Sequence, residues 1–223
     1  MTPTMFSKNI SLHPALPTDA LTLAKLHNAA FANDTLMEIM YGPLTMEDPL
    51  FVGDLEQTIR DDPHAELMKA VDDESNQIVG WSWWSIYQDA VAHAKAEHEA
   101  HERHTTPPPN SICPQAYFDY EDLKASARSK WLGERPAAIL QVLVVHPKYQ
   151  GRGIGTKLLM VGVVEAQRLK LPAWVEASPA GQMVYKRCGF RDAERLELDF
   201  AKYGFKGLML IYCMLIDDVN VDK

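Results

Sequence analysis

An apolar run that leads into a glycine-rich turn is the feature that most constrains the fold of this chain. Residues Ala137–Val145 (AAILQVLVV) have the length and composition of a strand buried on both faces. His146-Pro147 ends the run, a turn with three glycines follows at 150–156, and a helix is expected from Ile154 to Lys170. A buried strand that passes through a tight turn into a helix is typical of a mixed α/β domain.

Hydrophobic periodicity and turn residues predict the other elements. Strands are expected at residues 9–15, 64–71, 77–87, 172–177, 190–198 and 208–216, and helices from Thr18 as N-cap and at 46–60, 116–132 and 178–187. The segment 89–110 is rich in Ala, His and Glu and then in Pro, which favours an exposed helix followed by an extended loop. Residues 89–135 therefore form a predicted helical insertion before the strand at 137–145.

Length and charge exclude several classes of protein. The 223 residues are 47% hydrophobic, which fits a single globular domain over 1–223 with one insertion. Lys plus Arg is 22 and Asp plus Glu is 30, so the net charge is 22 − 30 = −8. This acidic balance argues against a nucleic-acid partner and is compatible with a cationic one, although solubility explains it equally well.

The cysteines and the apolar segments indicate where in the cell the protein is expected. The three cysteines, Cys113, Cys188 and Cys213, lie far apart and form no CxxC pair, so neither a disulfide framework nor a thiolate zinc site is expected. Residues 1–9 lack the apolar segment of a signal peptide, and the longest apolar runs are far too short to span a membrane. We therefore expect a soluble cytoplasmic protein without a membrane partner, as a monomer or homodimer.

The glycine turn has the chemistry of a phosphate site. Backbone N–H groups at a helix N-terminus are free and carry a partial positive charge, and glycines let a phosphate approach them. An ordinary strand-to-helix turn needs only one glycine, whereas Gly151, Gly153 and Gly155 alternate here. Lys157 follows Thr156, the wrong order for a P-loop, and the spacing is not the GxGxxG of dinucleotide-binding folds.

Two segments resemble the motifs of one superfamily. Val144–Gly155 is similar to motif A of the GNAT N-acetyltransferases, Gln/Arg-x-x-Gly-x-Gly/Ala, and Val184–Phe190 to motif B, Tyr-x-x-x-Gly-Phe. The resemblance covers most of the chain outside 89–135 and implies a V-shaped mixed sheet flanked by helices. Glu-Ala-Ser at 176–178 and Tyr-Cys-Met at 212–214 look most like the puromycin-type and fungal small-molecule acetyltransferases.

The resemblance implies an acetyl-CoA-dependent N-acetyltransferase that transfers acetyl directly to a small-molecule primary amine in a ternary complex. The pantetheine arm would pair with the strand backbone, where an N–H near Leu143 or Val144 would stabilise the oxyanion. The cofactor-binding residues that it implies are Leu143, Val144, Val145, Gln150, Gly151, Arg152, Gly153, Ile154, Gly155, Thr156 and Ser178.

The resemblance also suggests catalytic groups. Tyr185 holds the family's position for the general acid that protonates the leaving thiolate, unless it only packs ahead of Gly189-Phe190. Glu176 is the candidate base, acting through water; otherwise it holds the following helix or is a solvated strand end. Gln141 stands where other members place a Glu, and an amide cannot act as a base. Cys188 is not needed as a nucleophile.

Several alternatives remain. The acceptor could be a protein N-terminus or lysine, or the chain could be a non-catalytic CoA sensor. A metal-dependent regulator could use His93, His98, His101 and His104, but their spacing is not HExxH, so we favour a solvated helix and expect no metal site. The insertion, with Asp119, Glu121 and Asp122, could shape an acceptor pocket, and Trp81, Trp83 and Trp84 are expected mainly in the core.

Overall fold

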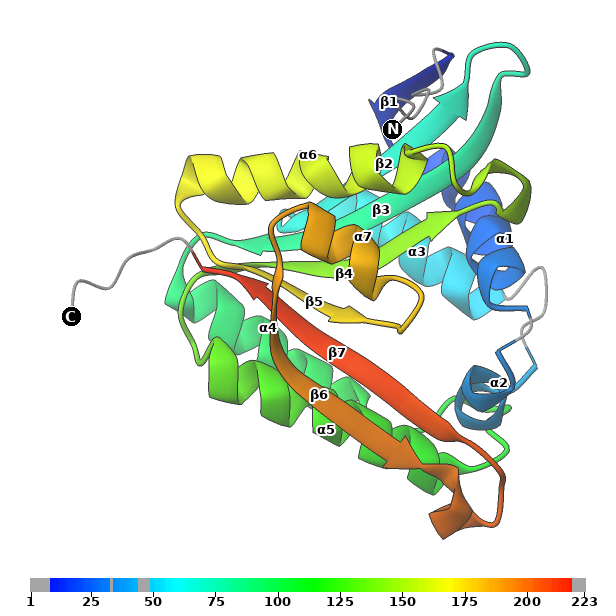
Figure 1. Ribbon diagram of the computed structural model, residues 1–223, viewed down its shortest axis with the longest axis vertical. Coiled ribbons are helices and arrows are strands. Elements are labelled where there is room, and N and C mark those ends of the chain that lie inside the picture. The colour runs from blue at the N-terminus through cyan, green and yellow to red at the C-terminus, as the bar shows by residue number, and fades with distance from the viewer. Residues whose placement is uncertain (1–8, 33, 44–48, 218–223) are drawn as a thin grey trace. The chain divides into compact units, whose positions relative to one another are not determined.

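The computed structural model describes residues 9–32, 34–43 and 49–217 (Figure 1). The chain divides into two compact units that alternate along the sequence. The first holds residues 1–33, 45–86 and 139–165, and the second holds 34–44, 87–138 and 166–223. The single domain predicted for 1–223 stays a prediction. Residues 1–8, on which the expectation about a signal peptide rests, lie outside the described residues.

The first unit contains four strands in the order β1-β2-β3-β4. They are β1 (Ile10–Pro14), β2 (Ala65–Asp72), β3 (Gln77–Tyr87) and β4 (Ala137–Val145). Residue 87 of β3 and residues 137–138 of β4 belong to the second unit. Its helices are η1 (Pro17–Asp19), α1 (Ala20–Phe31), α3 (Pro49–Asp61), η2 (Pro147–Tyr149) and α6 (Ile154–Leu169), of which residues 166–169 belong to the second unit. β2 pairs antiparallel with both β1 and β3, so the predicted hairpin at residues 64–87 is confirmed.

Two tryptophans on opposite faces of β3 anchor the core of this unit. Trp81 is fully buried, and its indole N–H donates to the Leu23 carbonyl of α1 at 3.0 Å. Trp84, also fully buried, packs against α6, where a Cβ on Gly162 would lie only 2.2 Å from the ring. Glycine at 162 therefore lets α6 approach β3 closely. The prediction that these two side chains belong to the core is confirmed.

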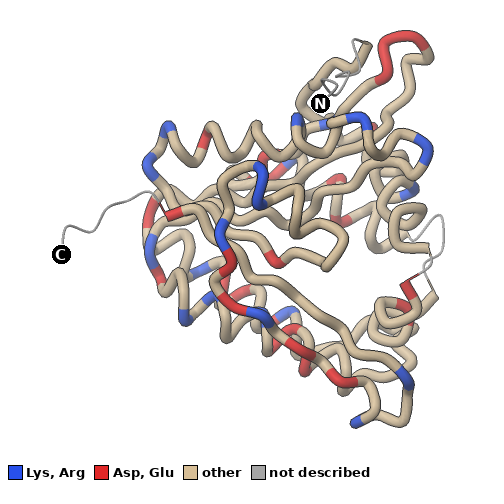
Figure 2. Tube along the Cα trace, viewed as in Figure 1, with Lys and Arg blue, Asp and Glu red and all other residues tan. Residues whose placement is uncertain are grey.

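The second unit contains three strands in the order β5-β7-β6. They are β5 (Ala173–Ala177), β6 (Arg191–Asp199) and β7 (Leu208–Ile216), and β7 pairs antiparallel with each neighbour. Its helices are α2 (Thr35–Tyr41), α4 (Ala90–Arg103), α5 (Pro114–Trp131), α7 (Gln182–Arg187) and η3 (Phe200–Tyr203). In Figure 1, α4 and α5 run beside each other, and Figure 2 shows charges of both signs along β6.

The helical starts differ most from expectation. α1 begins at Ala20 after η1, and Asp19 rather than Thr18 fixes the turn, because its carboxylate accepts from the Leu16 N–H at 2.7 Å and from Lys69 at 2.6 Å. Of the predicted helix at 46–60, residues 46–48 lie outside the described residues and α3 begins at Pro49. α2 was not predicted; its N-cap Asp34 accepts from the Met37 N–H.

The strand predictions agree with the structure to within about two residues at each end. The mixed α/β class is confirmed, as is a helical segment, α4 and α5, before β4. The V shape of the sheet stays a prediction. No helix in the described ranges is long and apolar enough to cross a membrane.

Candidate active site

The glycine turn adopts the backbone that its sequence requires. Gly151 and Gly153 have φ of +75° and +78°, in the left-handed region that residues with a Cβ rarely occupy. A Cβ on Gly151 would meet no atom within 4 Å, so backbone conformation rather than space demands glycine there. The turn delivers the chain into α6 at Ile154, whose first N–H groups have no partner within the helix. This is a cradle of backbone donors for an anion.

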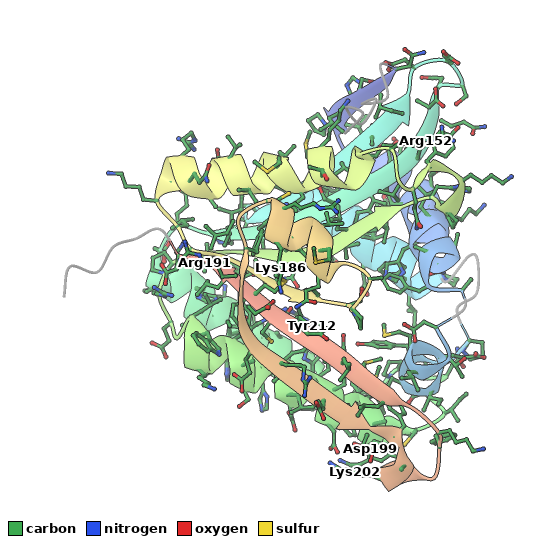
Figure 3. All side chains as sticks on the ribbon, in the orientation of Figure 1. Arg152, Lys186, Arg191, Asp199, Lys202 and Tyr212 are labelled. Carbon is green, nitrogen blue, oxygen red and sulfur yellow. The ribbon has the colours of Figure 1, made fainter. Side chains whose placement is uncertain are left out.

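Side chains of the same loop brace it from outside. The Gln150 amide donates to the Val145 carbonyl at 3.1 Å and thereby ties the loop to the end of β4. Arg152, labelled in Figure 3, donates to the Lys148 carbonyl at 2.9 Å and lies 4.9 Å from the centre of the Tyr149 ring. The loop is therefore held in place before any ligand binds, with a guanidinium at its edge.

The predicted pantetheine strand is packed on both faces. Val144 is 3% exposed in the cluster with Trp81, whereas Leu143 and Val145 pack against the cluster that holds Ile154. A Cβ on Gly80 would lie 2.8 Å from the Val144 carbonyl, so β3 and β4 approach each other closely here. The side chains are core, as expected, and leave the backbone groups of β4 as the only candidates for chemistry on this segment.

In the second unit, Tyr185 lies on α7 with its ring held from two sides. The side chain is 8% exposed, and its ring meets Phe190 edge-on at 5.9 Å. On the other side, a Cβ on Gly181 would come within 2.9 Å of the ring. Burial, with a smaller contribution from Cys188, raises the pKa of the Tyr185 phenol well above its usual value. The hydroxyl therefore stays protonated and can donate a hydrogen bond.

Ser178 lies in the turn between β5 and α7 rather than at the first turn of a helix. α7 begins at Gln182, four residues later than predicted, because residues 178–181 form a turn in which the Ser178 hydroxyl accepts from the Gly181 N–H at 3.3 Å. Pro179 has no N–H to donate within this turn. The hydroxyl of Ser178 is exposed.

Glu176 is buried in an ion pair that the sequence did not suggest. Its two oxygens accept from Nε and Nη2 of Arg128 at 2.6 and 2.8 Å, and the Trp174 indole N–H also donates to it. Burial would raise the pKa of Glu176, but Arg128 outweighs burial and the pKa lies below its usual value. A solvated strand end is therefore wrong, and this geometry argues against Glu176 as the base.

The ion pair continues into α4. Arg128 Nη1 lies 3.6 Å from Glu97, whose Oε1 lies 3.7 Å from Nε2 of His93. His93 is 1% exposed, stacks on Tyr87 and donates through Nδ1 to the Arg135 carbonyl at 2.7 Å. The solvated-helix interpretation is therefore wrong for His93.

The other histidines of the segment lie nearer the surface. His98 and His101 are exposed, and His104 lies 3.5 Å from Glu121. Over the described part of the chain, no group of three or more His, Cys, Asp or Glu side chains is arranged to hold a metal ion.

The acidic residues of α5 have separate surroundings. Glu121 is 7% exposed, accepts from the Tyr41 hydroxyl at 2.7 Å and pairs with Lys124 at 2.9 Å, so its charge is already neutralised. Asp119 accepts from the Tyr203 hydroxyl. Together with Asp122 it lines an open groove of about 310 Å³ over Leu123, Ser126, Glu197, Leu198 and Lys202. Of the three acidic residues Asp119, Glu121 and Asp122, the two that line the groove are the ones without a buried cation beside them.

A comparison with protein families identifies the fold around these groups. Residues 118–192 match the acetyltransferase (GNAT) domain model, from α5 through the glycine turn and Tyr185 into β6. This stretch of the chain is similar to the GNAT acetyltransferases. The match begins inside the segment 89–135, so most of α5 lies within the matched region rather than outside it.

Solved structures agree with the GNAT fold over almost the full length. An agmatine N-acetyltransferase matches with a TM-score of 0.69 at 13% identity, covering 94% of this chain and 99% of that one. A mosquito arylalkylamine N-acetyltransferase-like protein matches with a TM-score of 0.66 at 15% identity, covering 93% and 99%. A putative acetyltransferase from Salmonella typhimurium, solved with acetyl-CoA, matches at 0.58 and 12% identity, covering 97% and 98%. At these identities the matches show the fold alone.

Sequence reasoning missed Arg128 and the contact that Glu97 makes with it. A signal for Arg128 was present, because Tyr117, Glu121, Lys124 and Arg128 recur at helical spacing and so share one face of α5. That face also carries buried Ala116 and Ala127, which marks it as inward-facing. A charged stripe on a buried helix face predicts buried ion pairs, although it does not name their partners.

Proposed function

We propose that this GNAT acetyltransferase transfers the acetyl group of acetyl-CoA directly to a primary amine of a small molecule. The observation that carries the proposal is the left-handed glycine loop, which presents backbone donors at the start of α6. Matches to an agmatine and an arylalkylamine N-acetyltransferase support a small amine as acceptor. The finer likeness to puromycin-type and fungal enzymes belongs to the same proposal.

In this proposal the glycine loop binds the pyrophosphate of acetyl-CoA. The backbone N–H groups of residues 151–156 hold the pyrophosphate, and the helix dipole of α6 complements its charge. Arg152 adds a guanidinium at the edge of the loop, and Gln150 keeps the loop in register with β4. The backbone of Leu143–Val145 pairs with the pantetheine arm, and the Ser178 hydroxyl offers it a further hydrogen bond.

The bound cofactor supplies an activated acetyl thioester. The amine nitrogen attacks the carbonyl carbon, the carbon–sulfur bond breaks, and the Tyr185 hydroxyl donates its proton to the thiolate. The proton that the nitrogen loses on forming the amide then restores the Tyr185 phenol. A backbone N–H near Leu143 or Val144 stabilises the oxyanion, a contribution of about 3 kcal/mol. Glu176 has no catalytic role in this proposal, because Arg128 holds both of its oxygens.

A thiol-release assay tests the proposal directly. The protein is mixed with acetyl-CoA and a panel of amines at pH values from about 6 to 9, a range that contains the ordinary pKa of histidine. We expect thiol release with at least one small amine and much less with Tyr185→Phe. If CoA binds tightly and no amine releases thiol at any pH in this range, the chain is a CoA sensor. If peptides are acetylated and small amines are inert, the acceptor is a protein. A cytoplasmic monomer or homodimer stays a prediction.

A further inference from the structure

We propose that the acceptor of this enzyme reacts as the free amine without a general base from β4 or β5, so that weakly basic amines are its preferred acceptors. The inference rests on the proposed function and narrows its substrate class to amines acidified by a neighbouring electron-withdrawing group. It follows from the state of the ionisable side chains on the two strands and of Tyr185.

Glu176 is the only carboxyl group on β4 or β5, since the other residues of these strands are apolar or, at 141, an amide. Both of its oxygens are engaged by Arg128 in a bidentate pair, and one also accepts from Trp174. The Glu176 side chain is 8% exposed and that of Arg128 is 14% exposed. To accept a proton, Glu176 would have to break this pair and leave a guanidinium buried without its partner.

Burial opposes the ionised form of Glu176, but the cations beside it outweigh burial and hold its pKa below the usual value. From α5, Arg128 and Lys124 favour its ionised form, and the Trp174 indole on its own strand does the same. From α4, Glu97 lies against Arg128, and its like charge opposes this effect. From β7, Cys213 lies opposite Glu176 in the register and has its thiol pKa raised by burial, so it stays neutral. Glu176 is therefore a fixed anion.

Neither Gln141 nor Tyr185 can act as the general base in place of Glu176. The Gln141 amide donates to the Ser85 hydroxyl at 3.2 Å, and an amide does not take up a proton near neutral pH. The Tyr185 phenol is protonated, because burial holds its pKa high, and it serves as the acid. The side chains that the proposed mechanism brings to the reaction thus include an acid and no base.

An enzyme without a general base can acetylate only those acceptor molecules whose amine is already neutral in solution. At pH 7 an amine with a pKa of about 8 has roughly 200 times the neutral fraction of an alkyl amine with a pKa of about 10.4. Amino-acid amides, hydrazines and β-halogenated amines belong to the first class. We expect them to exceed alkyl amines of the same size in kcat/KM near neutral pH.

The pH profile of two matched acceptors tests the inference. 2-Phenylethylamine and its β,β-difluoro analogue have nearly the same shape, but the fluorines lower the pKa of the ammonium. At saturating acetyl-CoA we expect kcat/KM to rise about tenfold per pH unit up to the pKa of each acceptor and then to level off. Two plateaus that begin at one shared pH would reveal a protein base and overturn the inference, while the proposed function would stand. No thiol release with any amine overturns both.

A charge-free variant gives a second, independent readout. Arg128→Gln with Glu176→Gln replaces the ion pair by two amides without burying a lone charge. We expect the pH profiles of both amines to keep their shape, with kcat/KM within about threefold of wild type. A loss of about a hundredfold confined to the more basic amine would identify Glu176 as a base and contradict the inference. Circular dichroism confirms folding, and the wild-type profiles decide the matter if the variant does not fold.

Discussion

Removal of Arg128 should destabilise the second unit strongly, because it would leave a buried carboxylate without its cation. Arg128→Met keeps the volume and the apolar stem of the side chain but removes both hydrogen bonds to Glu176 and the contact with Glu97 at 3.6 Å. Loss of one partner from a buried pair costs about 3–5 kcal/mol. For a chain of this length, that lowers Tm by roughly 6–20 °C.

The same variant has a characteristic pH dependence. In the wild type the pKa of Glu176 lies below its ordinary value of 4.5, so the pair stabilises the fold above that value and the contribution is lost as the pH falls through the folded pKa. In Arg128→Met, burial without a cation raises the pKa of Glu176, so the residue takes up a proton at higher pH. The difference in stability is therefore largest near pH 7 and shrinks as the solution becomes acidic.

Thermal unfolding followed by circular dichroism measures the effect, with Lys130→Met as the matched control on α5. Lys130 pairs with Glu194 at 2.9 Å, but its side chain is 60% exposed, so its removal should cost less than about 1 kcal/mol. Arg128→Met with Glu176→Gln should recover part of the loss, because no unpaired charge remains. A Tm for Arg128→Met as close to wild type as that of Lys130→Met, or a loss that does not change between pH 7 and pH 4, would refute the reasoning.

Three further substitutions test the proposed site and the core. Tyr185→Phe should lower turnover about a hundredfold while the Kd for acetyl-CoA changes less than about twofold, and Tyr117→Phe, in the core of the second unit, should do neither. Gly153→Val should abolish acetyl-CoA binding in calorimetry, because its φ of +78° is strained for valine and the side chain blocks the loop, whereas Gly204→Val, at φ +84°, should preserve binding. Gly162→Ala should lower stability by about 1–3 kcal/mol through overlap with Trp84, whereas Gly53→Ala on α3, with open space around it, should be neutral or stabilising.

The elements that the sequence predicted best are those with a strong local signal. The limits of β4 agree with the structure to the residue, because AAILQVLVV is bounded by Pro136 and by His146-Pro147. The glycine turn and the start of α6 at Ile154 were also predicted correctly, because glycines mark the two positions, 151 and 153, at which φ is positive. In contrast, α2 has seven residues and its apolar side chains pack on α5, far away in sequence.

The candidate site was predictable only in part, for the same physical reason. A backbone cradle is encoded by consecutive residues, so its residues can be read from one segment. The environment of Glu176 depends on Arg128, 48 positions earlier, and on Glu97 beyond it. No periodicity within β5 carries that information, because an ion pair between distant segments depends on tertiary packing. The same holds for His93, whose neighbours Tyr87 and Arg135 flank the α4–α5 segment.

These contacts change what the segment 89–135 is. As an insertion it would be a surface addition to a GNAT core, free to vary in length or be removed. Instead, α5 supplies the cation that neutralises Glu176 on β5, and α4 supplies Glu97 and a buried His93 behind it. With the helices absent, β5 would carry a carboxylate with no cation. Glu176 on β5 and Arg128 on α5 therefore neutralise each other's buried charge, and the segment is a structural part of the second unit.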